Sequence, residues 1–119
     1  MDTTTVFNLD EALARVDDDM EFLCTLMAML LEQAPHDLAA IRAALAAGDP
    51  VAVARTAHHL KGAVLQFSSP ALYESLKELE GLGRAGRLPE AAPVYARVET
   101  GLQQLLEALR AILAKGEQV

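Results

Sequence analysis

The sequence predicts an all-α protein, an antiparallel up-down four-helix bundle with a short N-terminal helix as a lid. Apolar residues recur every three to four positions along most of the chain, which is the period of a helix that buries one face. Glycine and proline divide these periodic segments. There is no Trp and only 4% of the residues are aromatic, a composition that favours helix over sheet. At 119 residues, the chain is expected to form one domain over residues 1–119.

The first two helices are predicted on either side of three consecutive aspartates. A short helix covers about residues 9–16, and residues 17–19 then supply an N-cap and favourable negative charge for a long second helix. Pro35 lies inside this helix, and because the apolar period resumes after it, we expect a kink rather than an end. The helix ends at Gly48. Its first half is expected to bury a stripe formed by Phe22, Leu23, Leu26, Met29 and Leu30.

Two helix starts of the same kind follow. Asp49 is the expected N-cap of the third helix, with Pro50 in the first helical position that proline favours, and this helix runs to about Phe67. Ser69 and Pro70 repeat the signal for the fourth helix. Its inward residues are predicted to be Leu72, Leu76 and Leu79.

Three glycines, Gly81, Gly83 and Gly86, are expected to loosen the end of the fourth helix. Pro89 then opens the last helix. Apolar residues recur there in alternating steps of four and three, the seam of a helix in a bundle. The seam consists of Ala91, Tyr95, Val98, Leu102, Leu105, Leu109 and Ile112.

The charge of the chain narrows the classes of partner. A net charge of −7 and a pI near 4.8 argue against nucleic acid and anionic membranes, which both require a basic surface. The apolar run 22–31 is too short to span a bilayer, and the N-terminus lacks the basic start of a signal peptide. We therefore expect a cytoplasmic protein, and the Met1 start fits a free-standing one. Cys24, the only cysteine, is expected to be a small core residue.

His58 is the candidate reactive residue. On a helical wheel at about 100° per residue, starting from Val51, the apolar residues of the third helix fall between about 160° and 240°. His58 lies at about 340°, Gly62 at about 20° and Lys61 at about 280°. Arg55 lies beyond Gly62, at about 40°. The imidazole is therefore predicted to face water between cations, beside a residue without a side chain, which indicates a group that carries an anion.

His59 is the rival candidate. It lies about 160° around the helix from Lys61, so this lysine cannot neutralise an anion bound there. The third of the chain around His58 is also the basic one, because residues 55–87 hold five Lys and Arg against three Glu, whereas residues 1–50 hold ten acids against two Arg. The alternative is that both histidines are merely solvated residues on a polar face.

The run Ala57-His58-His59-Leu60-Lys61-Gly62 resembles the H-x-[LI]-K-G signature of histidine-containing phosphotransfer (HPt) domains, the phosphocarriers of multistep two-component relays. The resemblance extends along nearly the whole chain. It includes residues 9–11 in the leading helix, the 31–35 segment, and residues 46–49 before the histidine helix. It continues with Leu79 and Glu80, followed by Gly86.

The resemblance implies a role for each matching residue. His58 would accept the phosphoryl group, Lys61 would contact its oxygens, and Gly62 would leave room for the partner to close over the imidazole. Glu80 stands where HPt domains carry the Gln or Glu that orients the histidine, with Arg84 as a second cation. From spacing alone, Glu80 is equally well an ordinary surface residue paired with Arg84 or Lys77.

Two positions depart from the family pattern, which usually has small residues where this chain has Leu65 and Ser68. Leu65 lies only about 20° from His58 on the wheel, so a bulky apolar side chain is expected on the exposed face. Either Leu65 contacts the apolar surface of a partner, or it obstructs docking. We favour a docking contact, because Lys61 and Gly62 have no structural reason to remain together beside an idle histidine.

The resemblance implies a monomeric phosphocarrier that moves phosphoryl groups between the aspartates of response-regulator receiver domains, including those of hybrid sensor kinases. We expect no cofactor of its own, no ATP-binding or autokinase activity, and Mg²⁺ supplied by the receiver. A metal site is not predicted, because adjacent imidazoles point about 100° apart and the chain has no CxxC or HExxH motif. The alternatives are a docking bundle that is not phosphorylated and a helical dimerisation domain without a relay role.

Overall fold

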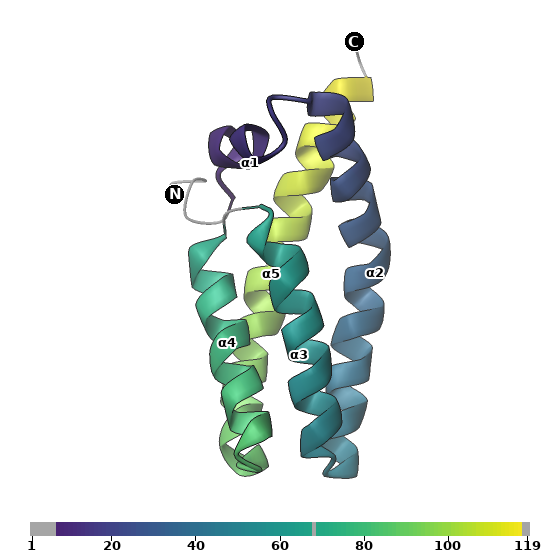
Figure 1. The fold of residues 1–119 in the computed structure, drawn as a ribbon. Coiled ribbons are helices and arrows are strands. Elements are labelled where there is room, and N and C mark those ends of the chain that lie inside the picture. Colours follow the sequence, from purple (N-terminus) through teal and green to yellow (C-terminus); the bar gives the residue numbers. More distant parts are fainter. Residues whose placement is uncertain (1–6, 68, 118–119) are drawn as a thin grey trace.

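The computed structural model describes residues 7–67 and 69–117, which form five helices. Four long helices run side by side, and a short one lies across one end (Figure 1). The helices are α1 (Leu9–Arg15), α2 (Met20–Ala47), α3 (Pro50–Leu65), α4 (Pro70–Arg84) and α5 (Leu88–Glu117). The predicted fold class, an all-α bundle with a short N-terminal helix, is confirmed.

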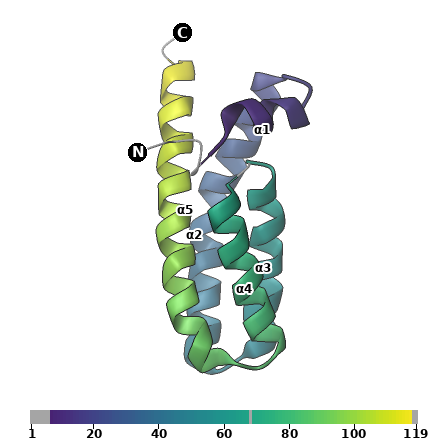
Figure 2. The same cartoon turned by 90° about the vertical axis from the view of Figure 1, so that its left-hand side faces the viewer.

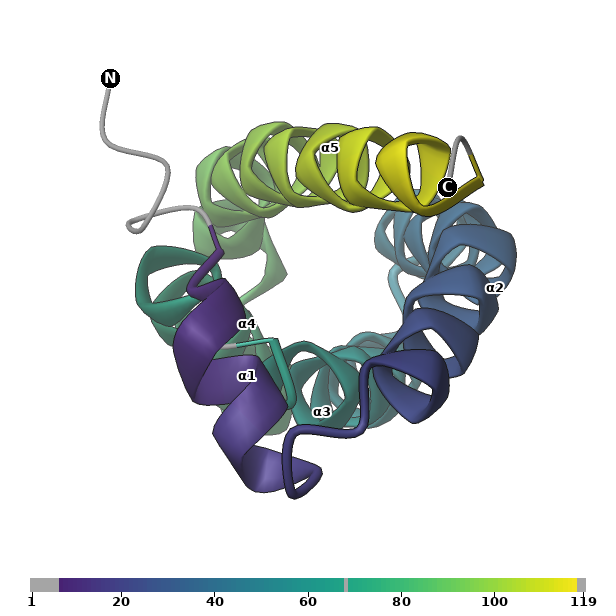
Figure 3. The same ribbon diagram turned by 90° about the horizontal axis from the view of Figure 1, so that it is seen from above.

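The long helices follow one another around the bundle in the order α2, α3, α4, α5, and α5 closes the ring against α2 (Figure 3). Because α2 and α5 have 28 and 30 residues but α3 and α4 only 16 and 15, the longer pair extends beyond the shorter pair at one end (Figure 2). Helix α1 lies in this space, over the ends of α3 and α4. The α3–α4 pair is therefore covered at one end by α1.

Local sequence sets most helix boundaries. Asp19 and Asp49 accept backbone N–H hydrogen bonds as the N-caps of α2 and α3, and Gly48 ends α2 in the left-handed region with φ 67°. Ser69 occupies the N-cap position of α4, but its side chain makes no capping hydrogen bond. Helix α3 ends two residues earlier than expected, at Leu65.

The inward faces of α3, α4 and α5 are those that the sequence predicts. All members of the α5 seam are buried except Ile112, which is partly buried against the core. The expected α2 stripe is wrong at two positions, because Phe22 and Met29 are exposed. The buried face of α2 is centred further around the helix, and Phe22 and Met29 both lie to one side of it. That face consists of Leu23, Met27, Leu30, Ala34, Asp37, Ile41 and Ala44.

Gly83 allows α3 and α4 to pack close together. A Cβ atom at this position would lie 2.9 Å from the Ala54 nitrogen and 3.0 Å from the Pro50 oxygen, so only glycine fits without a shift of the backbone. The expectation that Gly81 and Gly83 loosen the end of α4 is wrong, because both lie inside the helix. Gly86, with φ 72°, lies in the turn that follows.

No helix in the described part of the chain combines the length and the apolar character needed to cross a bilayer.

Candidate functional site

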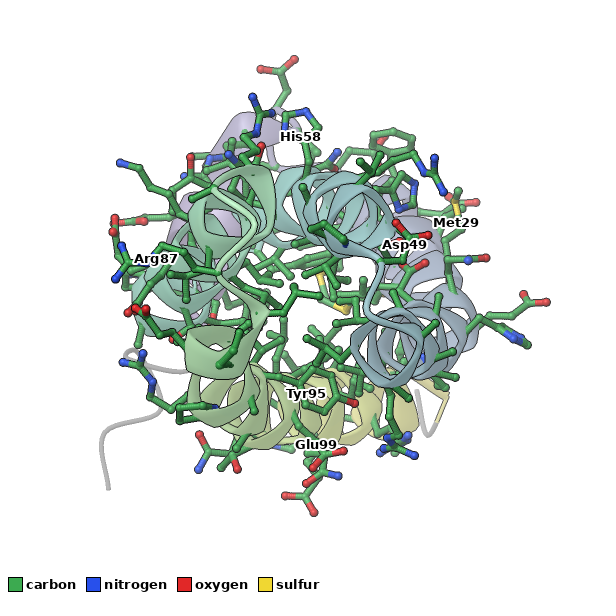
Figure 4. The ribbon with its side chains drawn as sticks, turned by 90° about the horizontal axis from the view of Figure 1, so that it is seen from below. Met29, Asp49, His58, Arg87, Tyr95 and Glu99 are labelled. Carbon is green, nitrogen blue, oxygen red and sulfur yellow. The ribbon has the colours of Figure 1, made fainter. Side chains whose placement is uncertain are left out.

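Helix α3 places His58 on the outer surface of the bundle (Figure 4). The side chain is 64% exposed, whereas the preceding residue, Ala57, is fully buried. The imidazole is nevertheless fixed, because its Nδ1 lies 3.0 Å from Oε2 of Glu80 on α4. The predicted exposure of His58 and its predicted proximity to Glu80 are both present.

Glu80 is a buried carboxylate shared by three side chains. Lys61 Nζ lies 2.7 Å from its Oε1, and Arg84 Nη2 donates to its Oε2 at 2.5 Å. Burial raises the pKa of the Glu80 carboxyl, but the Lys61 and Arg84 side chains, together with His58, outweigh burial and lower that pKa to about 2. Glu80 is therefore ionised at neutral pH.

An ionised Glu80 determines which ring nitrogen of His58 carries the proton. A carboxylate can only accept hydrogen bonds, so Nδ1 must be the donor in the His58–Glu80 contact. In the neutral imidazole, the lone pair is then on Nε2, the nitrogen not engaged by Glu80. The arrangement is chemically suited to nucleophilic attack by Nε2 on an electrophile that approaches from solvent.

Lys61 is less free than the helical wheel suggests. Its side chain is only 18% exposed, it is paired with Glu80, and its ammonium lies 5.9 Å from the centroid of the Tyr73 ring. Arg84, also paired with Glu80, is mostly exposed. Two cations therefore flank the His58–Glu80 pair, one largely buried and one at the surface.

The surroundings of His58 are open on the side of Gly62. A Cβ atom at Gly62 would meet no atom within 4 Å. Arg55 and Arg84 line a hollow of about 650 Å³ that also reaches His58. Leu65 is 49% exposed, and its carbonyl oxygen accepts a hydrogen bond from Arg15 of α1 at 2.6 Å. Ser68 lies outside the described residues.

His59 has a carboxylate of its own, which the sequence analysis missed. Its Nδ1 lies 3.5 Å from Oδ2 of Asp37 on α2, and Asp37 is buried. The helical period offered a signal for Asp37, because it continues the buried series of Leu30, Ala34 and Ile41. Tyr73 was also missed, and its approach to Lys61 depends on how α4 packs against α3.

A family model matches most of the chain, and two solved structures share its fold. The Hpt domain family matches residues 25–112. Among solved structures, the fold is similar to that of the HPT domain of a sensor hybrid histidine kinase from Shewanella, with a TM-score of 0.85, 20% identity, and coverage of 94% of this chain and 97% of that one. It is similar to histidine-containing phosphotransfer protein B from Pseudomonas aeruginosa, with a TM-score of 0.84, 22% identity, and coverage of 92% and 95%.

No curated protein sequence matches the chain. The two structural likenesses, at these identities, concern the fold alone. The family match covers most of the chain, including His58, Lys61, Gly62 and Glu80. The chain therefore belongs to the Hpt domain family, the histidine-containing phosphotransfer domains of two-component phosphorelays.

Proposed function

We propose that His58 accepts a phosphoryl group from the aspartyl phosphate of one response-regulator receiver domain and passes it to the aspartate of another. The observation that carries this proposal is the contact between exposed His58 and buried, ionised Glu80, because it leaves the Nε2 lone pair available and fixes the ring. His59 has a similar carboxylate contact but no lysine or arginine paired with that carboxylate among the described residues.

The transfer step needs no proton movement on this chain. Nε2 of His58 forms a bond to phosphorus while the bond between phosphorus and the aspartyl oxygen breaks, and the receiver's aspartate leaves as a carboxylate. The imidazole keeps its proton on Nδ1 and gains positive charge. Glu80, 3.0 Å from Nδ1, stabilises that charge, and the reverse step restores the neutral ring.

The two cations would serve the phosphoryl oxygens. Lys61 and Arg84 already lie beside His58 through their shared partner Glu80, so a phosphoryl group on Nε2 can attract them without a change in the helices. Gly62 leaves open space next to the ring for the approaching receiver. The Mg²⁺ that we expect the receiver to carry would neutralise further charge on the phosphoryl group.

A comparison of His58→Gln with His59→Gln tests the proposal. Each protein is treated with phosphoramidate, which phosphorylates histidine without a receiver, and separately with phosphorylated receiver domains, and acid-labile phosphate is measured. His58→Gln should abolish acceptance from both donors, whereas His59→Gln should retain acceptance from phosphoramidate. Both side chains are about two-thirds exposed, so neither change should lower the free energy of unfolding by more than about 0.5 kcal/mol.

Equal loss in the two variants, or loss only in His59→Gln, would contradict the assignment of His58. If the unchanged protein accepts no phosphate from either donor, the chain is a docking or dimerisation bundle rather than a phosphocarrier.

A further inference from the structure

A groove of about 420 Å³ lies between α2 and α3, on the side of α3 that carries His59. We call it the α2–α3 groove. Its walls are largely apolar and include Leu26, Met29 and Ala63. Asp37 and His59 are the acid–base pair within it, and Glu32 also lines it. It is separate from the hollow beside His58, which lies between α3 and α4.

Asp37 is a buried carboxylate without a strong counter-ion. It is 7% exposed, accepts a hydrogen bond from Gln33 at 3.3 Å and lies 3.5 Å from His59. Within residues 7–67 and 69–117, no lysine or arginine forms an ion pair with it. Glu80, by contrast, is paired with both Lys61 and Arg84. A buried carboxylate is unfavourable unless it is compensated, so Asp37 would gain from a cation that a partner brings.

The exposed apolar side chains lie on the two helices that form this groove. Large apolar side chains that are exposed come from α2 and α3 alone within the described part of the chain. They are Met20, Phe22, Met29, Val51 and Leu65. Met29 and His58 both lie at the outer surface (Figure 4). Of these, Met29 lines the groove itself, and an exposed apolar side chain in a largely apolar groove indicates a surface for a protein partner.

We propose that the α2–α3 groove selects the receiver domain, by taking a surface segment that presents a lysine or arginine among apolar side chains. This inference rests on the proposed function, which supplies the receiver as the occupant. A typical interface covers about 800 Å² per partner, so a receiver centred on His58 must extend over a neighbouring helix. The apolar side chains favour α2 as that helix, and Asp37 with Glu32 makes the groove complementary to a positive charge.

The test separates docking from chemistry. The proteins compared are the unchanged chain, Asp37→Asn, Met29→Ser and, as a control, Glu78→Gln, which removes one negative charge from an exposed residue paired with Arg97 outside the groove. Each is first phosphorylated with phosphoramidate. Among purified receiver domains from the same organism, the one to which the unchanged chain transfers phosphate fastest is chosen. The rate of transfer to this receiver is then measured as a function of its concentration, at low and at high salt.

All four proteins should accept phosphate from phosphoramidate equally. Asp37→Asn and Met29→Ser should each raise the KM for the receiver about five- to tenfold with kcat unchanged, because they weaken docking and leave His58 intact. Glu78→Gln should behave like the unchanged chain. Added salt should raise the KM of the unchanged chain more than that of Asp37→Asn.

An unchanged KM in Met29→Ser would overturn the inference. Because Met29 is exposed, this variant should fold normally, and its result holds whatever Asp37 contributes to folding. A raised KM in Met29→Ser with no effect of Asp37→Asn would overturn the requirement for a basic side chain. If Asp37→Asn lowers phosphoramidate labelling or thermal stability instead, Asp37 is structural. Absence of labelling in the unchanged chain would defeat the proposed function itself, a separate outcome.

Discussion

Lys61 and Glu80 form an ion pair of 2.7 Å across the interface between α3 and α4, and both side chains are largely buried. The pair lies beside His58, which contacts the other oxygen of the same carboxylate. Glu80 therefore links the His58 imidazole to Lys61. A change in any one of these three residues is expected to affect the other two.

Replacing Lys61 with Ala should slow transfer from a phosphorylated receiver while the bundle stays folded. The variant loses one of the two cations that flank His58 and Glu80, but Arg84 still pairs with Glu80. We expect a loss of about a hundredfold to a thousandfold in rate, the range for removal of one charge-stabilising group. Rapid-quench measurements of phosphohistidine formation, with circular dichroism as the folding control, test this. An unchanged rate would reduce Lys61 to a structural partner of Glu80.

The low pKa of Glu80 predicts a particular dependence of stability on pH. Its pKa is about 2 in the folded protein, below the ordinary value of 4.5. The unfolded chain therefore binds more protons between these values, so this contribution is complete above about pH 4.5 and is lost as pH falls towards about 2. Urea unfolding of the unchanged protein and Glu80→Gln across that window should show a difference that shrinks with acidification. A constant difference would mean that Glu80 is not held ionised by its neighbours.

Gly62→Ala should stabilise the fold while it slows transfer from a receiver. The new methyl group meets no atom within 4 Å, and alanine is the better helix former, so the free energy of unfolding should rise by up to about 1 kcal/mol. Transfer from a receiver should slow, because the methyl group occupies space next to His58 that the proposal reserves for the partner. Labelling by phosphoramidate should be unaffected. Unimpaired transfer from the receiver would show that the open space at Gly62 is not needed.

Gly83→Ala should destabilise the bundle by about 1 to 3 kcal/mol, because its Cβ would meet the backbone of Ala54 and Pro50 at 3.0 Å or less. Gly81→Ala is the matched control, since it lies in the same helix and its Cβ would meet nothing within 4 Å. Thermal unfolding should show a lower Tm for the first and an equal or higher Tm for the second. Equal Tm values would mean that α3 and α4 separate readily.

Leu65→Ala tests the departure of this chain from the family pattern. The side chain is 49% exposed, so stability should change little, and loss of a docking contact should weaken receiver binding by about 1 to 2 kcal/mol. Isothermal titration calorimetry with an unphosphorylated receiver measures this. Faster transfer in the variant would show instead that Leu65 obstructs the approach to His58. A large fall in Tm would show that the Leu65 side chain packs against the core, since the backbone carbonyl that accepts from Arg15 is unchanged.

Much of the fold could be predicted from the sequence because it depends on relations within three or four residues. The caps at Asp19 and Asp49, the end of α2 at Gly48 and the inward seam of α5 are all such relations. The exposure of His58 beside Gly62 follows from the same period. The prediction was wrong for Phe22 and Met29, because a broad apolar stripe does not show where its centre meets the neighbouring helices.

The sequence by itself determined the helices, the inward faces of α3, α4 and α5 and the surface position of His58, since these follow from local geometry. Only the tertiary structure decided that Glu80 meets both His58 and Lys61, that Asp37 lies opposite His59, and that Gly83 touches the backbone of α3. Each of these contacts joins two helices. Their distances depend on the rotation and axial shift of one helix against another, which are set by how the whole core packs and not by the spacing of residues along either helix.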